Sequence, residues 1–484
     1  MSSQAQIEAF EDTWHWNESA ERAFDEVVTG PHSDASIMLR AMRSALGEND
    51  MMAYLAMMAV RLIELHRVLK PTGSLYLHCD PTASHYLKIL LDSIFGPTNF
   101  HSEIIWKRTS GHSDALRYGP VHDTILFYTK SDKGLWNPTY QPYEPNYEEQ
   151  YYRYKDADGR RFMSGDLGTA GLQGGGYEYE WKGVTRIWRV PVETMERLDK
   201  ESRVFYTKNG IPRIKRYLDE AKGMPTQDVW ADIEALRSWH QERLGYPTQK
   251  PVALLERIIA ASSNEGDLVL DPFCGCGTTV HAAQKLNRQW IGIDVTHLAI
   301  ALVERRLKEA FPGIVFDVHG VPKDHDGARD LAERDKHEFQ KWITATIGAQ
   351  PYKGGKKGMD RGIDGYLHFR DADKKPQFAV ISVKGGGIKS GDIRDLKGTM
   401  EREKAAMGLF LTLNEPTREM EKEAAAAGFY ETGKLDLKVK VPKLQILTAA
   451  QILDGKRPRM PFGLTESLKK AAREEAAEQQ DRLL

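Results

Sequence analysis

One stretch of the chain decides the fold: Asp271-Pro272-Phe273-Cys274-Gly275-Cys276-Gly277-Thr278-Thr279. Before it, the apolar run 268–271 predicts a β-strand, and after it the apolar spacing over 278–286 predicts a helix. A second strand is predicted over 290–294, and it ends in an acid, Asp294. Strand, glycine-rich turn, helix and strand in this order are typical of a βαβ unit.

The glycine-rich turn has a chemistry of its own. Gly275 and Gly277 allow the backbone to approach a ligand closely, and free N–H groups at the start of the helix favour a carboxylate or phosphate. Asp294 ends the next strand, where an acid can accept hydrogen bonds from ribose hydroxyls. The alternative is tight packing of strand against helix, which uses the same glycines. Cys274 and Cys276 have the spacing of a metal-binding pair, but no second pair exists, so we do not expect zinc.

The same alternation of helix and strand continues on both sides of this unit. Apolar residues at helical spacing predict helices over 51–69, 86–95, 254–261 and 297–307. Short apolar runs predict strands over 74–79, 104–106 and 124–128. We therefore expect an α/β sheet.

Three motifs resemble those of a known family. Tyr246-Pro-Thr-Gln-Lys-Pro251, the glycine-rich stretch and Trp290-Ile-Gly-Ile-Asp294 follow one another as in the β-class amino-methyltransferases of DNA. The resemblance implies a Rossmann-like, doubly wound α/β domain over roughly 6–307. It also implies transfer of a methyl group from S-adenosylmethionine to the exocyclic amine of adenine or cytosine in double-stranded DNA, in a restriction–modification context.

The resemblance also assigns residues to the cofactor. It implies that Thr248, Gln249 and Lys250 lie beside the methionine part, and that Asp294 holds the ribose. The remaining expected cofactor-binding residues belong to the glycine-rich stretch: Asp271, Phe273, Gly275, Gly277 and Thr278.

The catalytic motif of this family, Asp/Asn/Ser-Pro-Pro-aromatic, does not occur in the chain. Asp80-Pro81-Thr82 lacks the second proline and the aromatic residue, and Asn137-Pro138-Thr139-Tyr140 falls in the irregular middle of the chain. Residues 6–16 resemble the segment that comes after the catalytic motif in relatives. Two interpretations stay open: the chain starts late, or it is a catalytically deficient DNA-binding relative.

The middle of the chain, 130–240, loses its periodicity and is rich in Tyr, Trp, Arg and Gly. Cations match phosphates and aromatic rings match bases, so this segment is a candidate target-recognition module. The alternative is a solvated tyrosine-rich insertion. The cations expected to bind DNA here and on the preceding strand are Lys107, Arg108, Arg186, Arg189, Arg213 and Lys215.

The C-terminal segment resembles an Mrr-type restriction-endonuclease-like α/β domain. A helix is predicted over 328–347, and strands come next around 364–369, 378–384, 408–413 and 444–447. Asp364 and Lys384 match the catalytic acid and lysine of such a nuclease, with Asp364 a candidate Mg²⁺ ligand. Ser382 replaces the second ligand, so cleavage is not expected to be efficient, although Glu338 could substitute. A simple surface pair of Asp364 and Lys384 is the alternative. DNA contacts are expected from Lys353, Lys356, Lys357, Lys384 and Lys389.

Length and composition limit the class of protein and the number of domains. The chain has 484 residues, of which 28% are charged, with a formal net charge of −2 and three cysteines. With a mean hydropathy of −0.52, these values favour a cytoplasmic protein without a disulfide framework. We expect five parts: the methyltransferase halves 1–129 and 241–322, the recognition module 130–240, the endonuclease-like domain 323–457 and a charged tail 458–484. A nuclease guided by a methyltransferase-like module is a further alternative, and a homodimer or a restriction–modification partner subunit stays open.

Overall fold

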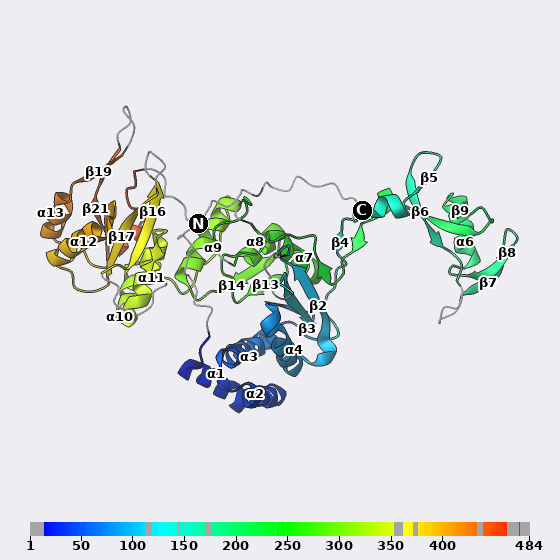
Figure 1. Ribbon diagram of the computed structural model, residues 1–484, viewed down its shortest axis with the longest axis horizontal. Coiled ribbons are helices and arrows are strands. Elements are labelled where there is room, and N and C mark those ends of the chain that lie inside the picture. The colour runs from blue at the N-terminus through cyan, green and yellow to red at the C-terminus, as the bar shows by residue number, and fades with distance from the viewer. Residues whose placement is uncertain are drawn as a thin grey trace. The chain divides into compact units, whose positions relative to one another are not determined.

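The computed structural model describes residues 14–111, 118–143, 146–169, 176–237, 239–246, 248–352, 362–370, 376–432, 439–461 and 474. The chain forms two compact units (Figure 1). The main unit contains Met1–Asn137 and Val229–Leu484, and the inserted unit contains Pro138–Asp228. The inserted unit lies within the segment 130–240 that lost its periodicity. Among the described residues, no helix is long and apolar enough to span a bilayer.

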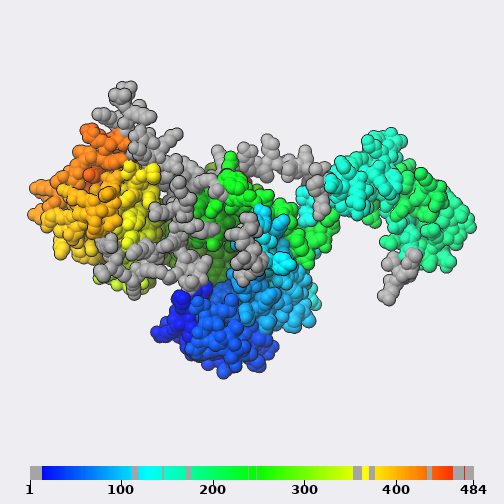
Figure 2. All heavy atoms as spheres, in the orientation of Figure 1, coloured from blue at the N-terminus to red at the C-terminus, as the bar shows by residue number. Residues whose placement is uncertain are grey.

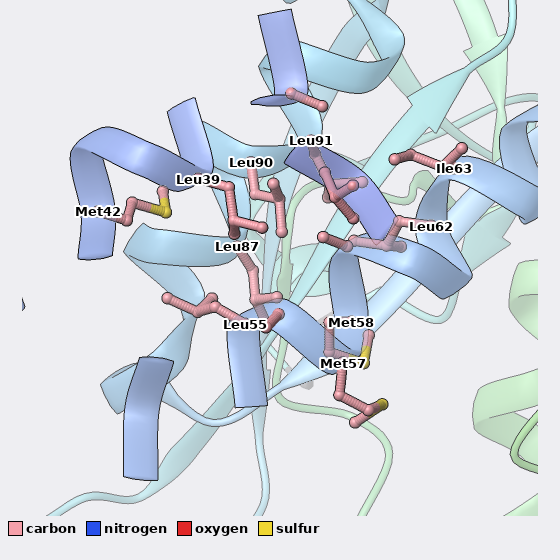
Figure 3. Close-up of a cluster of buried hydrophobic side chains, with 14 of the residues drawn as sticks. Leu39, Met42, Leu55, Met57, Met58, Leu62, Ile63, Leu87, Leu90 and Leu91 are labelled. Atoms are coloured by element: carbon pink, nitrogen blue, oxygen red, sulfur yellow. The ribbon is translucent and has the colours of Figure 1, made fainter. Parts of the chain in front are cut away.

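Four N-terminal helices form a large hydrophobic core in the main unit. They are α1 (Glu18–Thr29), α2 (Ser33–Leu46), α3 (Asp50–Val68) and α4 (Pro81–Phe95). Asn17, Asn49 and Asp80 cap α1, α3 and α4 with their side-chain oxygens, which fixes where these helices begin. Leu39, Leu55 and Leu87 meet from α2, α3 and α4 in Figure 3, and the same helices form the blue surface in Figure 2.

These helices pack on a four-stranded sheet whose order is β1-β3-β2-β12. Its strands are β1 (Ser74–Cys79), β2 (Phe100–Lys107), β3 (His122–Thr129) and β12 (Val229–Trp230). The short η1 (Pro97–Asn99) precedes β2. The strand β3 is antiparallel to both neighbours, whereas β12 is parallel to β2. Helix α7 (Val252–Ser262) packs on this sheet through Leu254.

The predicted βαβ unit is confirmed. It consists of β13 (Leu268–Asp271), α8 (Thr278–Lys285) and β14 (Gln289–Gly292), followed by α9 (His297–Ala310). The two strands are parallel and form a sheet of their own. The chain therefore has the expected α/β architecture, but the methyltransferase strands among the described residues fall into two sheets.

The inserted unit corrects the expectation of an irregular segment. Its main sheet has the order β5-β6-β10-β9, formed by β5 (Tyr154–Lys155), β6 (Arg161–Asp166), β9 (Val204–Tyr206) and β10 (Pro212–Tyr217). A hairpin and a helix carry Trp188 and Met195 into its core. The remaining elements are β4 (Tyr140–Gln141), α5 (Tyr147–Tyr151), β7 (Tyr177–Trp181), β8 (Val184–Trp188), α6 (Val192–Lys200), η2 (Leu218–Glu220) and β11 (Met224–Pro225). Because these strands are short and half exposed, their sequences show no clear alternation of apolar and polar residues.

The C-terminal domain is a five-stranded sheet, in the order β15-β16-β17-β18-β21, with helices on both faces (Figure 1). The expected single helix over 328–347 is two helices, because Asp335 leaves helical geometry (φ −151°) and caps the second. The elements are α10 (His325–Arg334), α11 (Lys336–Thr346), β15 (Gln350–Pro351), β16 (Gly365–Arg370), β17 (Pro376–Lys384), α12 (Ser390–Glu403), β18 (Met407–Thr412), α13 (Arg418–Ala426), β19 (Phe429–Thr432), β20 (Val439–Pro442), β21 (Leu444–Thr448) and α14 (Ala449–Leu453).

Candidate functional site

The glycine-rich turn is fixed by bonds within itself. Asp271 accepts hydrogen bonds from the Phe273 N–H (3.0 Å) and the Thr279 hydroxyl (2.6 Å). Gly277 is left-handed (φ +73°), and a Cβ there would lie 2.7 Å from a methyl group of Val303. Gly277 therefore serves the turn and its packing on α9, as the packing alternative proposed. Asp271 likewise braces the turn with both of its carboxylate oxygens.

Asp294 and Gly275 are brought together, as the sequence motif predicts. The Gly275 N–H donates to one carboxylate oxygen of Asp294 (3.0 Å), and the Thr296 N–H (2.9 Å) and hydroxyl (2.8 Å) donate to the other. A carboxylate offers about four acceptor positions, so one remains for a ligand hydroxyl. The acid therefore positions the turn and stays able to hold a ribose.

Exposed apolar residues lie next to this acid in the chain and in the turn that it contacts. The exposed fraction is 51% for Phe273, 51% for Ile293 and 84% for Val295. Exposed apolar groups beside a hydrogen-bond acceptor suit a ligand that joins an aromatic base to a hydroxylated sugar. The sequence motifs did not single out Val295. Its signal was an apolar residue directly after the acid that ends the second strand.

The 248–250 motif contacts the start of α8, just after the turn, through the Lys250 carbonyl. Gln249 accepts from the Leu244 N–H (2.7 Å) and donates to the Glu242 carbonyl (2.8 Å), so it holds the preceding loop. The Lys250 carbonyl accepts from the Thr278 hydroxyl (3.3 Å). Thr248 is exposed. The structure thus assigns Gln249 and Thr278 to bracing within the protein, and it leaves Thr248 facing solvent.

A buried cation supports the turn from behind. Arg306 on α9 is 2% exposed, and its guanidinium donates to the Cys276 carbonyl and the Thr278 hydroxyl (both 3.1 Å). It also donates to Nδ1 of His281 (3.3 Å), whose Nε2 lies 2.8 Å from a Glu474 carboxylate oxygen. Burial and the charge of Arg306 lower the pKa of His281, so the imidazole is neutral. The sequence motifs missed Arg306, because a basic residue in an amphipathic helix usually points to solvent.

A second polar cluster lies at the carboxyl end of β1. His78 Nε2 is 2.9 Å from an Asp123 carboxylate oxygen, and Arg108 lies 3.5 Å from the other. Burial lowers the pKa of His78. Burial opposes ionisation of Asp123, but the hydrogen bond with His78 and the nearby cations outweigh it and lower the Asp123 pKa.

The turn cysteines do not form a metal centre. Cys274 and Cys276 are buried free thiols, and burial raises the pKa of Cys274 to about 12. Across the part of the chain that the structure describes, no group of three or more His, Cys, Asp or Glu side chains could hold a metal ion.

The candidate DNA-binding cations fall into two groups. Lys107 and Arg186 are exposed, and Arg189 is exposed while donating to the Gly168 carbonyl (3.3 Å). The others are engaged: Arg108 with Asp123 (3.5 Å), Arg213 with Asp166 (2.5 Å) and Lys215 with Asp156 (2.9 Å). The side chain of Lys215 is only 12% exposed, so this lysine would have to leave its partner to reach a phosphate.

The C-terminal acid is also engaged. Asp364 accepts from the Gln340 amide (3.0 Å) and from the Val383 N–H (2.6 Å), while Lys384 is exposed. Glu338 pairs with Lys341 (2.8 Å) and lies 3.4 Å from His297, away from the substitute role considered for it. Asp364 offers one carboxylate and Ser382 only a hydroxyl, so these two residues are a poor fit for Mg²⁺. Lys389 is exposed. Lys353, Lys356 and Lys357 lie outside the described residues.

Two parts of the chain match models of known protein families. Residues 33–305 match the family model described as DNA methylase, N6_N4_Mtase. The chain belongs to this DNA methylase family. Residues 336–454 match the family model described as NACHT-associated inactive Restriction Endonuclease 1. The predicted combination of an amino-methyltransferase domain with a C-terminal restriction-endonuclease-like domain is confirmed.

Individual relatives agree with the family. The type II methyltransferase M.EcaI of Enterobacter cloacae is 35% identical over 262 residues, which cover 52% of this chain and 57% of that protein. The StyLTI Mod subunit, a type III restriction-modification enzyme of Salmonella typhimurium, is 30% identical over 52% of this chain and 41% of its own length. The chain thus spans about half the length of these relatives. The PvuII DNA methyltransferase, described as cytosine-N4-specific, is a structural match with 14% identity, 54% and 71% coverage and a TM-score of 0.29.

Proposed function

We propose that this DNA methylase binds S-adenosylmethionine at the carboxyl ends of β13 and β14. The observation that carries the proposal is the Asp294 carboxylate, held by the Gly275 N–H at 3.0 Å. Its chain neighbours Ile293 and Val295, and Phe273 in the turn, are exposed apolar residues. The remaining acceptor position of Asp294 suits a ribose hydroxyl, and the exposed apolar groups suit the adenine base. The N-terminus of α8 favours the ligand's carboxylate.

The proposed reaction is methylation of the exocyclic amine of adenine or cytosine in duplex DNA, in a restriction–modification context. The bound cofactor supplies an activated methyl group on a sulfonium centre. The target base must leave the duplex, and its amine needs acceptor oxygens that hold it toward that methyl group. Lys107 and Arg186 are exposed cations that suit the DNA backbone.

The alternative proposal is a DNA-binding protein that keeps the cofactor site without methylation. Two observations favour it for residues 1–484. Asp80 uses its carboxylate to cap α4, accepting from the Thr82 N–H (2.7 Å) and Ala83 N–H (3.1 Å). Asn137 donates its amide to the carbonyls of Ala260 (3.1 Å) and Ser263 (3.0 Å). Both near-matches to the catalytic motif thus have a role in the fold, Asp80 as a helix cap and Asn137 as a tie to the end of α7.

Calorimetric titration with S-adenosylmethionine tests the cofactor site. Asp294→Ala should weaken binding by about 1–3 kcal/mol, because the ligand hydroxyls lose a charged acceptor and the Gly275 N–H loses its partner. Glu265→Ala, in the exposed turn before β13, is the matched control and should bind as wild type does. Equal affinity of wild type and Asp294→Ala would refute the assignment.

Tritium-methyl transfer to duplex DNA separates the two proposed functions. Residues 1–484 alone should transfer little or no label, because they lack the Asp/Asn/Ser-Pro-Pro-aromatic motif that holds the amine in this family. Adding an upstream segment with Asp-Pro-Pro-aromatic should give transfer that Asp294→Ala reduces. Robust transfer by residues 1–484 would mean that another group holds the amine.

A further inference from the structure

The loop 231–246 connects β12 to the 248–250 motif and exposes a tryptophan near its middle. Trp239 is 67% exposed, more than any other tryptophan that the structure describes. One exposed aromatic side chain is common on a protein surface and by itself indicates no function. The way in which the loop is held, and the place where it lies, distinguish Trp239.

The start of the loop is fixed to β2 and α7. The Trp106 indole N–H on β2 donates to the Ile233 carbonyl (2.8 Å). The Ile233 side chain is buried in one cluster with Trp106 and Leu254. The Arg257 guanidinium on α7 donates to the Asp232 carboxylate (3.0 Å), and this arginine side chain is only 12% exposed. The first residues of the loop are therefore held against the sheet and its covering helix.

The end of the loop is fixed beside the glycine-rich turn. The Gln249 side chain accepts from the Leu244 N–H (2.7 Å) and donates to the Glu242 carbonyl (2.8 Å). Leu244 and Tyr246 are buried in one cluster with Cys276 of the turn. A loop that is fixed at both ends has little conformational freedom left to lose when a ligand binds at its tip.

Hydrogen bonds also close the tip of the loop on both sides of Trp239. The His240 N–H donates to the Arg237 carbonyl (3.0 Å), and the Arg237 N–H donates to Nδ1 of His240 (3.0 Å). The Arg237 guanidinium lies 5.4 Å from the centre of the Trp239 ring, and the His240 ring meets it edge to face at 5.9 Å. These two residues position the indole, and most of its surface stays open to solvent.

Both ends of the loop lie at the carboxyl ends of strands. β12 is parallel to β2, with Trp230 paired to Trp106, and β1 and β2 are both antiparallel to β3. The loop therefore leaves the sheet at the edge where β1 and β2 end. At its other end, a Cβ on Gly275 would lie 3.3 Å from the Tyr246 ring, just after the carboxyl end of β13. Ligands of open α/β sheets bind outside the carboxyl ends of the strands.

Cations accompany the tryptophan at this edge. Lys107 ends β2 and is exposed, and Arg237 is exposed at the tip of the loop. Two acids of the loop are engaged within the protein, because Asp232 pairs with Arg257 and Glu242 caps the start of α7 with its carboxylate. Cations bind the phosphates of a nucleic acid, and an aromatic face stacks on a base. The combination favours DNA over an apolar protein surface as the occupant.

We propose that Trp239 stacks on an unpaired base of DNA, while Lys107 and Arg237 bind the adjacent phosphates. Inside a duplex both faces of a base are covered by its neighbours, so only a base that has lost its pair can turn a face to the ring. That base is either the one that leaves the duplex or its former partner, which becomes free to unstack. The proposal rests on the proposed function for its substrate, DNA, and adds a base-stacking residue outside the inserted unit.

Binding of residues 1–484 to three DNAs of matched sequence tests the proposal. The first is a fully paired duplex, the second carries a bulged 2-aminopurine as an extruded base, and the third carries 2-aminopurine opposite an abasic site as the partner left behind. Wild type should bind at least one of the last two about fivefold to a hundredfold more tightly than the paired duplex, and should quench its fluorescence by stacking. The DNA that shows the preference identifies the source of the base.

Four variants separate stacking from phosphate binding. Trp239→Leu should abolish both the preference and the quenching, whereas Trp239→Phe keeps an aromatic face and should retain most of each. Trp136→Leu is the matched control, because Trp136 is a second exposed tryptophan of the main unit (53%), and it should behave as wild type does. Arg237→Gln should weaken binding to all three DNAs by the same factor and reduce the slope of log K against log salt by about one, with the preference unchanged.

The outcomes distinguish this proposal from the proposed function. Equal affinity of wild type for paired and unpaired DNA, or a preference that Trp239→Leu retains, overturns the stacking site and leaves the proposed function intact. Failure to bind any of the three DNAs at low salt would overturn both. A dimer of wild type that Trp239→Leu converts to a monomer in light scattering, with no change in DNA preference, would make the loop a contact between copies of the chain. Trp239→Leu should bind S-adenosylmethionine as wild type does, which checks that the variant is folded.

Discussion

Asp294 of the methyltransferase domain and Asp364 of the C-terminal domain are both acids beside a strand. Asp294 follows β14 and Asp364 directly precedes β16. Each accepts a backbone N–H from a neighbouring segment, Gly275 for Asp294 and Val383 for Asp364. Their surroundings differ. The chain neighbours of Asp294, Ile293 and Val295, are exposed apolar residues, whereas Asp364 accepts from the Gln340 amide of α11. The better candidate for a ligand site is therefore the acid with exposed apolar neighbours.

The comparison extends to the residues behind each acid. The turn that faces Asp294 is supported by the buried guanidinium of Arg306, which contacts the Cys276 carbonyl and the Thr278 hydroxyl. Asp364 itself supplies the bracing in its domain, because it joins α11 to β17 through Gln340 and Val383. Both acids hold neighbouring segments together, but only the turn beside Asp294 has the additional support of a buried cation.

The largest effect is expected from removing the support of the cofactor turn. Arg306→Met should lower the free energy of unfolding by about 2–4 kcal/mol, because the Cys276 carbonyl and Thr278 hydroxyl lose a charged donor in a buried site. Urea denaturation measures this loss. Lys308→Met, on the exposed side of the same helix, should change stability by about 0.5 kcal/mol or less. Equal effects of the two substitutions would show that Arg306 does not support the turn.

The sequence predicted the βαβ unit well because its signals are local. An apolar run, a turn with glycines and an acid after the next strand lie within about thirty residues. Arg306 was missed because its partners lie 25 to 30 residues away along the chain and no local pattern marks them. The helix pair α10 and α11 was read as one helix, because Asp335 interrupts the helix as a cap without a glycine or proline.

The sequence also did not predict that the methyltransferase strands form two separate sheets. Each strand was recognisable by its own apolar run, but pairing depends on which edges find partners in three dimensions. The inserted unit shows the same limit, since its short strands contain few apolar residues: β7 reads Tyr-Glu-Tyr-Glu-Trp and β10 reads Pro-Arg-Ile-Lys-Arg-Tyr. Its residues were predicted to bind DNA from their type, and the ion pairs that engage Arg213 and Lys215 appear only in the structure.

A change of intermediate size in the free energy of unfolding is expected when the pH falls, because of His281. Burial and the charge of Arg306 lower its pKa in the folded protein, whereas an unfolded histidine titrates near about 6.5. The folded state then binds fewer protons, so its stability is complete above the unfolded pKa and declines as the pH falls below it. Between pH 7 and pH 5 the loss should be about 1–2 kcal/mol.

The matched variants for this pH dependence are His281→Gln and His319→Gln. His281→Gln should flatten the decline measured by urea denaturation at each pH, because the titrating group is gone. His319 is exposed, so His319→Gln should keep the wild-type profile. If the stability of His281→Gln declined with falling pH as steeply as that of wild type, the decline would belong to other titrating groups.

The smallest effect is expected at Asp364, where a metal site is incomplete. Wild type should gain no thermal stability from Mg²⁺ and should not nick supercoiled plasmid, because Asp364 offers a single carboxylate and Ser382 only a hydroxyl. Ser382→Glu adds a carboxylate two residues before Lys384, and Mg²⁺ at its dissociation constant would then stabilise the protein by about 0.4 kcal/mol. Adding Asp364→Ala should abolish that gain. The reason is that Mg²⁺ keeps most of its water and needs few protein ligands, so the two carboxylates together can suffice where one does not. If wild type and Ser382→Glu respond equally to Mg²⁺, Asp364 is already available to a metal, and the distinction between the two acids fails.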